Sequence, residues 1–179
     1  MNLRELLFGK VDAPPHAPSK PAPVKVSATP ASVCAVTSGE LIPIQEIPDP
    51  IFASGAMGPA VGIKPTDGII YAPVTGMVTV MTSTLHALGM TSDDGIEVLI
   101  HAGVDTVNLR GEGFHGFVRK GQHVRAGEPL MVYDLDKIRR AGYSDVAITV
   151  IINASSLPEV SVTSEGQVKA GETVMRIGG

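Results

Sequence analysis

The chain has 179 residues, a charged fraction of 18% and a formal net charge of −4. It contains no basic block, which excludes general nucleic-acid binding, because phosphate recognition requires clustered Lys and Arg. Tryptophan is absent and aromatic residues are 4%, which excludes base-stacking platforms and leaves an aliphatic core of Val, Ile, Leu and Met.

The single cysteine, Cys34, excludes an intrachain disulfide and a C-x-x-C site. We expect its thiol to be unreactive, because no activating partner stands near it in the sequence. No apolar run approaches the roughly 18 residues that a membrane span requires. A cytoplasmic location is therefore expected.

The N-terminal part of the chain differs in composition from the rest. Asn2 and Glu5 have capping-box spacing, and the leucines around them share one helical face. A helix this short is marginal on its own, so we expect a frayed tail, with any membrane contact peripheral and through residues 1–11. Residues 14–30 are rich in Pro, Ala, Ser and Lys, which predicts an extended linker. The expected organisation is a tail and linker over residues 1–36 and one domain over residues 37–179.

The domain has the texture of short strands separated by Gly and Pro about every ten residues. The clearest strand candidates are residues 68–74, 76–81 and 146–152. This spacing predicts an all-β sandwich or barrel with at most one or two short helices. One helix is expected over residues 135–141, with Asp134 as its cap and Gly142 beyond its end.

The sequence also contains an internal echo, since residues 121–131 resemble residues 166–175 with a one-residue offset. Each copy reads as a turn whose second glycine is followed by glutamate and then a new strand. Two copies predict a pair of similar β-motifs packed together, and not a solenoid.

Two histidines flank a predicted β-hairpin. Pairing Thr91 with Ile96 across the turn at residues 92–95 sets His86 directly opposite His101. Directly opposed residues project from the same face, with Cβ atoms about 5 Å apart. A one-residue slip would send the two rings to opposite faces. In the predicted register, two adjacent imidazoles suit phosphoryl transfer or metal binding.

From about residue 38 to the C-terminus, the chain resembles the glucose-type enzyme IIA domain of the bacterial sugar phosphotransferase system. The matching segments, in family order and at family spacing, are residues 47–53, 63–66, 71–76, 84–87, 95–107 and 111–114. The resemblance implies a mostly antiparallel β-sandwich, of the barrel-sandwich hybrid type, with a shallow active site. It also implies that the histidine phosphocarrier protein HPr donates a phosphoryl group to His101, which passes it to a cysteine on the IIB domain of a sugar permease.

The resemblance assigns a role to each residue around the expected site. A phosphoimidazole keeps a high transfer potential, which suits His101 as the phosphorylated nucleophile. His86 would donate an N–H to the phosphoryl oxygens, and Thr84, two residues earlier on the same strand face, would fix the tautomer of His86. By family analogy, the carbonyl of Gly103 would orient the His101 ring.

The expected docking surface for the partners combines acidic and apolar residues. Asp49 and Asp105 match family positions that face an arginine of HPr, although Asp49 also suits a turn start and Asp105 a loop cap. The expected apolar ring, which could also be ordinary core, consists of Ile51, Phe52, Ala56, Met57, Leu99 and Val107. Ala102, Thr75 and Leu88 depart from the family pattern, and we expect them to thin this rim. The other histidines, His16, His115 and His123, are expected on the surface.

Two alternatives use the same features. The pair of His86 and His101 could hold zinc with a carboxylate supplied by a partner, or belong to a metallopeptidase-like β-domain, although the chain lacks the additional H-x-H pair of such enzymes. The Gly-Glu turns also occur in biotinyl and lipoyl carrier domains, but neither Lys120 nor Lys169 has the expected context. The phosphocarrier reading requires no cofactor. It implies regulatory binding to transporters or glycerol kinase.

Overall fold

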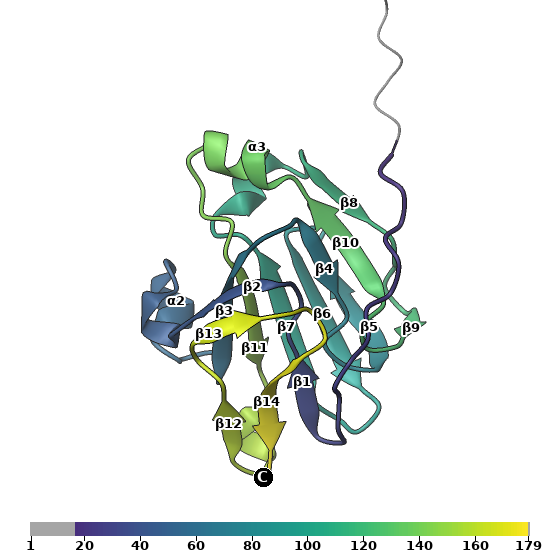
Figure 1. The fold of residues 1–179 in the computed structure, drawn as a ribbon, viewed down its shortest axis with the longest axis vertical. Coiled ribbons are helices and arrows are strands. Elements are labelled where there is room, and N and C mark those ends of the chain that lie inside the picture. The colour runs from purple at the N-terminus through teal and green to yellow at the C-terminus, as the bar shows by residue number, and fades with distance from the viewer. Residues whose placement is uncertain (1–16, 179) are drawn as a thin grey trace, which may run out of the picture.

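The computed structural model describes residues 17–178, which form β-sheets joined by short turns (Figure 1). The strands are β1 (Ser32–Cys34), β2 (Gly39–Ile42), β3 (Ala60–Pro65), β4 (Ile69–Tyr71), β5 (Gly76–Met81), β6 (Ala87–Ser92), β7 (Glu97–Ala102), β8 (Phe114–Gly116), β9 (His123–Val124), β10 (Pro129–Tyr133), β11 (Ala147–Ile151), β12 (Val160–Val162), β13 (Gly166–Val168) and β14 (Thr173–Ile177). The helices are short: α2 (Pro50–Ala53), α3 (Leu135–Arg140) and the 3-10 turns η1 (Ile44–Glu46), η2 (Thr106–Leu109) and η3 (Ala154–Ser156).

The largest sheet has eight strands in the order β13-β2-β3-β11-β7-β6-β5-β9. Two three-stranded sheets, β1-β14-β12 and β4-β10-β8, complete the fold. Every strand pair within the described residues is antiparallel. The prediction of a mostly antiparallel β-sandwich with at most two short helices is confirmed.

The core is aliphatic, as the composition predicts. Its largest fully buried side chains include Ile63, Ile70, Leu88, Met90, Ile100 and Leu130. Strand β7 shows how the sheet separates its two faces, because Ile100 and Ala102 are buried in this core while Leu99 and His101 lie on the opposite face. That opposite face is covered by a second, smaller cluster under η1 and α2, which contains Ile47, Phe52, Ile148 and Val150. His101 lies at the edge of this cluster, beside Phe52, and is only partly buried.

Helix α3 confirms the prediction for residues 135–141. Asp134 Oδ1 accepts a hydrogen bond from the backbone N–H of Lys137, and Gly142 follows the helix with a φ of +85°. The predicted helix around Leu6 lies outside the described residues. None of the helices in residues 17–178 is long and apolar enough to cross a membrane.

The domain begins earlier than the expected boundary at residue 37. Strand β1 lies within the predicted linker, yet it pairs with β14, and Val33 and Val36 are completely buried. Composition assigns the apolar run around Cys34 to the linker because Pro and Ala dominate the residues before it. Burial raises the pKa of the Cys34 thiol to about 11, as an unreactive thiol requires.

The internal echo marks a pseudo-symmetric pair of turns. In both copies the glycine N–H donates to an alanine carbonyl, and the N–H of the preceding alanine donates to a hydroxyl oxygen. These bonds run from Gly127 to Ala72 and from Ala126 to Thr75 in one copy, and from Gly171 to Ala35 and from Ala170 to Ser38 in the other. The repeated sequence therefore encodes a repeated local structure, as predicted.

Candidate functional site

The predicted register of the β6–β7 hairpin is wrong by one residue. His101 pairs with Ala87 and not with His86, and Thr91 pairs with Glu97. The turn is shorter than expected, because Ser92 and Ile96 exchange hydrogen bonds across three residues that end in Gly95, with a φ of +88°. A type I turn followed by a left-handed glycine is a common three-residue hairpin connection.

His86 nevertheless lies beside His101, with ring centroids 5.1 Å apart and the planes 74° from parallel. The reason is that His86 is not part of the strand. It follows Leu85, whose φ of +60° closes a turn in which the Leu85 N–H donates to the carbonyl of Thr82. This turn, residues 82–86, redirects the His86 side chain toward the ring that a regular strand would have left on the other face.

The half-buried His101 ring is held by its own backbone. Its Nδ1 lies 2.6 Å from the carbonyl oxygen of Gly103. A carbonyl only accepts, so Nδ1 carries the proton and Nε2 carries the lone pair. Gly103 has a φ of +78°, and the buried Thr106 packs against it while donating to the Ala102 carbonyl at 2.7 Å. The geometry therefore fixes a tautomer whose Nε2 is nucleophilic.

Two hydroxyls converge on Nδ1 of His86. Thr84 Oγ1 lies 2.6 Å away and Thr82 Oγ1 lies 3.3 Å away. The predicted contact of Thr84 is present, but its stated cause is wrong, since Thr84 lies in the turn and not on the strand. Thr82 also bonds to both backbone groups of Ala87, which ties the histidine to the start of β6.

The His86 ring is polarised in the opposite sense from His101. Desolvation by burial, and then the neighbouring His101, lower the pKa of His86, which favours its neutral form. When Thr84 donates its hydroxyl proton to Nδ1, the proton of the neutral ring lies on Nε2. The pair then presents one nucleophilic Nε2 and one Nε2–H donor.

Helix α2 forms one wall of the site. Asp49 Oδ1 caps this helix by accepting hydrogen bonds from the N–H groups of Ile51 at 2.8 Å and Phe52 at 3.3 Å, and Pro50 occupies the first turn. The Phe52 ring lies 5.5 Å from the His101 ring and is only 6% exposed. The prediction of Phe52 as a docking residue is wrong, because Phe52 is buried and its ring packs against the His101 ring.

The remaining predicted docking residues differ in how far they are exposed. Ile51 is 61% exposed and Val107 is 46% exposed. Ala56 and Asp105 are also exposed, whereas Met57 and Leu99 are partly buried against the second cluster. Asp105 precedes η2 with a φ of +58° and makes no capping hydrogen bond through its side chain. Only part of the predicted docking set is therefore exposed, because Phe52 is buried and Met57 and Leu99 are partly buried.

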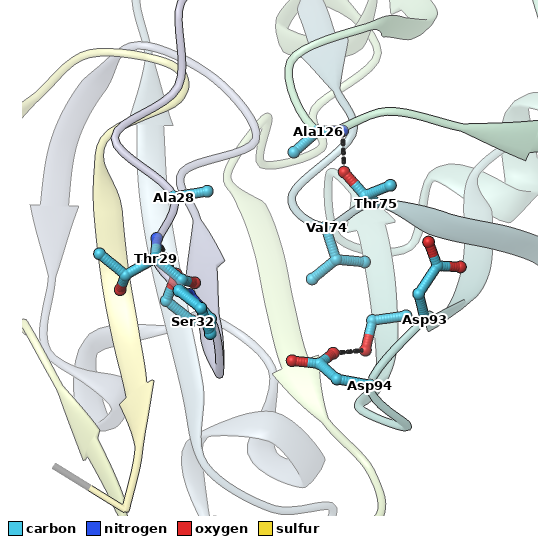
Figure 2. A pocket seen from close by; sticks show the side chains of 10 residues that line it. Ala28, Thr29, Ser32, Val74, Thr75, Asp93, Asp94 and Ala126 are labelled. Carbon is cyan, nitrogen blue, oxygen red and sulfur yellow. Dashed lines mark hydrogen bonds between the residues drawn. The ribbon is translucent and has the colours of Figure 1, made fainter.

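The departures from the family pattern do not thin this rim. Leu88 and Ala102 are each 1% exposed and face the main core. Thr75 lies at the far end of the β5–β6 hairpin, in the wall of a cavity of about 430 Å³. Figure 2 shows that cavity between Thr29 and Ser32 on one side and Asp93 and Asp94 on the other.

The other histidines do not join the pair. His123 is exposed and bonds to Asp93 at 2.9 Å, and His115 is partly exposed, with its ring 5.1 Å from that of Phe117. His16 lies outside the described residues. Among residues 17–178, no three His, Cys, Asp or Glu side chains lie close enough to hold a metal ion.

Sequence reasoning missed three residues near the site. Thr82 and Thr106 support the histidines through their hydroxyl groups. The only sign of this in the sequence is that each threonine stands close to His86 or Gly103, and this closeness matters only because the chain turns there. Val80 pairs with Gly89 on the site face of the sheet and is 49% exposed. Its β5 strand has a bulge between residues 78 and 80, which sequence alternation does not reveal.

Comparison with known proteins agrees with this architecture. A family model described as phosphoenolpyruvate-dependent sugar phosphotransferase system, EIIA 1, matches residues 31–157. The glucose permease IIA from Mycoplasma capricolum superposes with a TM-score of 0.74 at 32% identity, covering 80% of this chain and 93% of that one.

Curated relatives span the same region. The glucose-specific EIIA component of Staphylococcus aureus (strain COL) is 38% identical over 142 residues, and that of Oceanobacillus iheyensis is 40% identical over 141. Each match covers 79% of this chain and 86% of the relative. The mannose-specific EIIBCA component of Corynebacterium glutamicum is 38% identical over 141 residues, but the match spans only 21% of its length.

The chain therefore belongs to the EIIA 1 family of the sugar phosphotransferase system. It is a phosphocarrier, a component that transfers phosphoryl groups within that system. Family membership implies partners in the same system, such as HPr and a IIB domain.

Proposed function

We propose that His101 is the residue that carries the phosphoryl group, with Nε2 as the acceptor atom. The observation that supports this most directly is the hydrogen bond from His101 Nδ1 to the Gly103 carbonyl at 2.6 Å. It leaves the lone pair on Nε2, and a neutral imidazole with its lone pair exposed is the nucleophile that the reaction needs.

In the first transfer, the P–N bond to the histidine of phospho-HPr breaks as a P–N bond to His101 Nε2 forms. The leaving electron pair returns to the imidazole of HPr, and the proton on His101 Nδ1 stays in its bond to Gly103. In the second transfer, the thiolate of a IIB cysteine attacks phosphorus, and the electron pair of the P–Nε2 bond returns to His101. Both steps pass through loose transition states that depend on alignment and charge stabilisation.

His86 supplies that stabilisation in this proposal. Its Nε2–H donates to a phosphoryl oxygen, while Thr84 holds Nδ1 at 2.6 Å. The lowered pKa of His86 keeps the ring neutral before phosphorylation, which avoids placing a positive charge against His101. Arrival of the anionic phosphoryl group then favours the N–H contact.

Partner docking uses the surface around the pair. The carboxylates of Asp49 and Asp105 would attract the arginine of HPr, and Ile51 and Val107 would pack against apolar residues of each partner. Transient interfaces of this kind gain association rate and register from charge, and modest affinity from a small apolar centre.

The acceptor in this proposal is the IIB domain of a hexose permease, because the relatives are named for glucose and mannose. Regulatory partners, a transporter or glycerol kinase among them, would contact the same face, since phosphorylation adds about two negative charges there. We propose a cytoplasmic location for this activity because its phosphoryl source, phosphoenolpyruvate, is a cytoplasmic metabolite.

The deciding experiment supplies phosphoenolpyruvate, enzyme I and HPr and measures the intact mass of the chain. The wild type should gain one acid-labile, base-stable phosphoryl group. His101→Ala should gain none, and His86→Ala should accept the group but fail to pass it to a IIB domain. His123→Ala, which removes an exposed histidine outside the pair, should behave as wild type. Phosphorylation of His101→Ala would refute the assignment.

A further inference from the structure

The described part of the predicted linker is bound to the domain. Residues 17–29 have no helix or strand, yet they run along the sheets as an extended segment (Figure 1). The Val24 N–H donates to the Gly127 carbonyl at 3.0 Å, and the Ser27 N–H donates to the Gly171 carbonyl at 2.9 Å. These two glycines are equivalent positions of the internal echo, so the segment crosses between the pseudo-symmetric turns.

We propose that the two Gly-Glu turns form a peptide-binding groove whose ligand is this chain's own residues 24–29, here called the strap. The bonded N–H groups are three residues apart, which is the repeat of a polyproline II helix. The strap follows Pro21 and Pro23, residues that favour that conformation. The spacing of the two carbonyl acceptors in the groove therefore matches the three-residue repeat of the strap.

The contact requires glycine on the groove side. A Cβ atom at Gly127 would lie 2.5 Å from the Val24 carbonyl oxygen, and one at Gly171 would overlap the Lys25 carbonyl oxygen. Both glycines also have positive φ values, +86° and +89°. The strap backbone thus lies closer to the turns than any side chain would permit.

The turns are organised by their own residues. Glu128 Oε2 accepts the Arg125 N–H at 2.7 Å, and Glu172 Oε2 accepts the Lys169 N–H at 2.9 Å. The same carboxylate-to-backbone bond closes each turn without using the strap. The two carbonyls that face the strap are therefore fixed in position, and binding does not have to order them.

The groove is symmetric in its turns but sets one direction for its ligand. After its glutamate, the second turn continues with Thr173, whose N–H donates to Ser27 Oγ at 2.9 Å and whose Oγ1 donates to the Ser27 carbonyl at 3.2 Å. The first turn continues with Pro129, which has no N–H to donate. Only the second turn can anchor the serine, so the reversed strap loses that anchor.

The strap also fixes the position of the first described residues, Ala17 and Pro18. Ala17 and Pro18 form part of the wall of a cavity of about 490 Å³, next to Phe114 and His115 on β8. The β8 strand lies beside the turn that holds His86, because a Cβ at Gly116 would contact the Leu85 side chain at 3.6 Å. Ala17 and Pro18 therefore lie on the side of the domain where β8 meets the turn that holds His86.

Amide hydrogen exchange on the full chain, resolved by NMR, tests the groove. The N–H groups of Val24 and Ser27 should exchange at least about tenfold more slowly than those of Lys25 and Val26, which make no hydrogen bond to the described residues. Equal exchange rates at the four positions would overturn the proposal. So would a concentration-independent dimer in light scattering, because the strap would then occupy the groove of a second copy.

Two glycine variants separate the contact from backbone strain. Gly171→Ala should remove the slow exchange of Val24 and Ser27 and accelerate tryptic cleavage after Lys25. Gly166→Ala carries a similar positive φ, but its Cβ would meet none of the described residues within 4 Å, so exchange and cleavage should stay as in the wild type. Ser27→Ala should also release the strap without straining any turn. Equal behaviour of Gly166→Ala and Gly171→Ala would refute the groove.

A spin label tests this position of residue 17. Cys34 is buried, so a nitroxide on Ala17→Cys would be the single reactive label. It should broaden the amide signal of Phe114, and the broadening should disappear when Gly171→Ala is added. Retained protection of Ile100 in β7 would show that each variant is folded. Persistent broadening in the double variant would contradict a role for the strap.

Discussion

Replacing Gly103 by alanine tests the backbone geometry that fixes His101. The residue has a φ of +78°, and its Cβ would overlap Cγ2 of the buried Thr106 and lie 2.8 Å from the Ser144 carbonyl oxygen. The left-handed conformation costs about 1 kcal/mol for a residue with a side chain. Overpacking against two buried groups costs about 2 kcal/mol more. The total of about 3 kcal/mol corresponds to a fall in Tm of about 10 °C for a chain of this size.

Gly95→Ala is the matched control, since its φ is +88° but its Cβ would meet no described residue within 4 Å. It should lose only the conformational term, about 1 kcal/mol. Thermal unfolding followed by circular dichroism measures both losses. Below its Tm, Gly103→Ala should also accept phosphoryl from HPr about tenfold more slowly, because its carbonyl no longer aligns the His101 ring. Equal melting of the two variants together with wild-type phosphorylation would refute this geometry.

Three further outcomes follow from the same contacts. Thr84→Val should slow transfer from the chain to a IIB domain about tenfold in rapid-quench assays, and Thr84→Ser should restore it, because one hydrogen bond fixes the His86 tautomer. Since the folded state lowers the pKa of His86 below its usual 6.5, the unfolded chain binds a proton first. The free energy of unfolding should therefore decrease as pH falls below about 6.5, and denaturation of His86→Gln should show a weaker pH dependence. Cys34, with its pKa near 11, should react with an aromatic disulfide at pH 8 only after unfolding, so rapid labelling of the native chain would contradict its burial.

The strands and α3 could be predicted because their signals are local. Asp134 caps α3 and Gly142 ends it, and both act on residues within one turn. The strand candidate at residues 76–81 matches β5 for the same reason, since apolar runs bounded by Gly and Pro need no distant partner to be recognised. The edge of the domain was misjudged because β1 is identified only by its pairing with β14.

One residue expected in the rim lies elsewhere. The resemblance to the family, and not the hairpin register, leads us to expect Leu88 in the rim. In the structure Ala87 pairs with His101, so Leu88 faces the main core and is 1% exposed. The hairpin turn that sets the register depends on the side chain of Ser92. The separate turn at residues 82–86 depends on a left-handed Leu85, a conformation that leucine rarely adopts. The pairing of the histidines was predicted from a wrong register and restored by an unpredicted turn.

The amino-acid composition does not predict the strap. A segment rich in Pro and Lys lacks the apolar surface to form a core, and composition therefore favours a free linker. The N–H groups of Val24 and Ser27, the Ser27 side chain and the Thr29 hydroxyl hold it, and their partners on the second half of the chain lie more than 100 residues away. The echo that provides those acceptors was recognised in the sequence, but its ligand was not.

The depth of the proposed phosphoryl site follows from how far α2 extends over the sheet. Phe52 closes the face over β11 and stops against the His101 ring, whereas Gly89 and the exposed Val80 leave the face over β6 and β5 open. A deeper cover would keep out the partner histidine and cysteine, which must approach Nε2 in line. A shallower one would hydrate the Nδ1 bond to Gly103 and weaken control of the tautomer. A four-residue helix capped by Asp49 provides the intermediate cover. Shortening α2 should therefore weaken control of the His101 tautomer, while the partners could still reach Nε2.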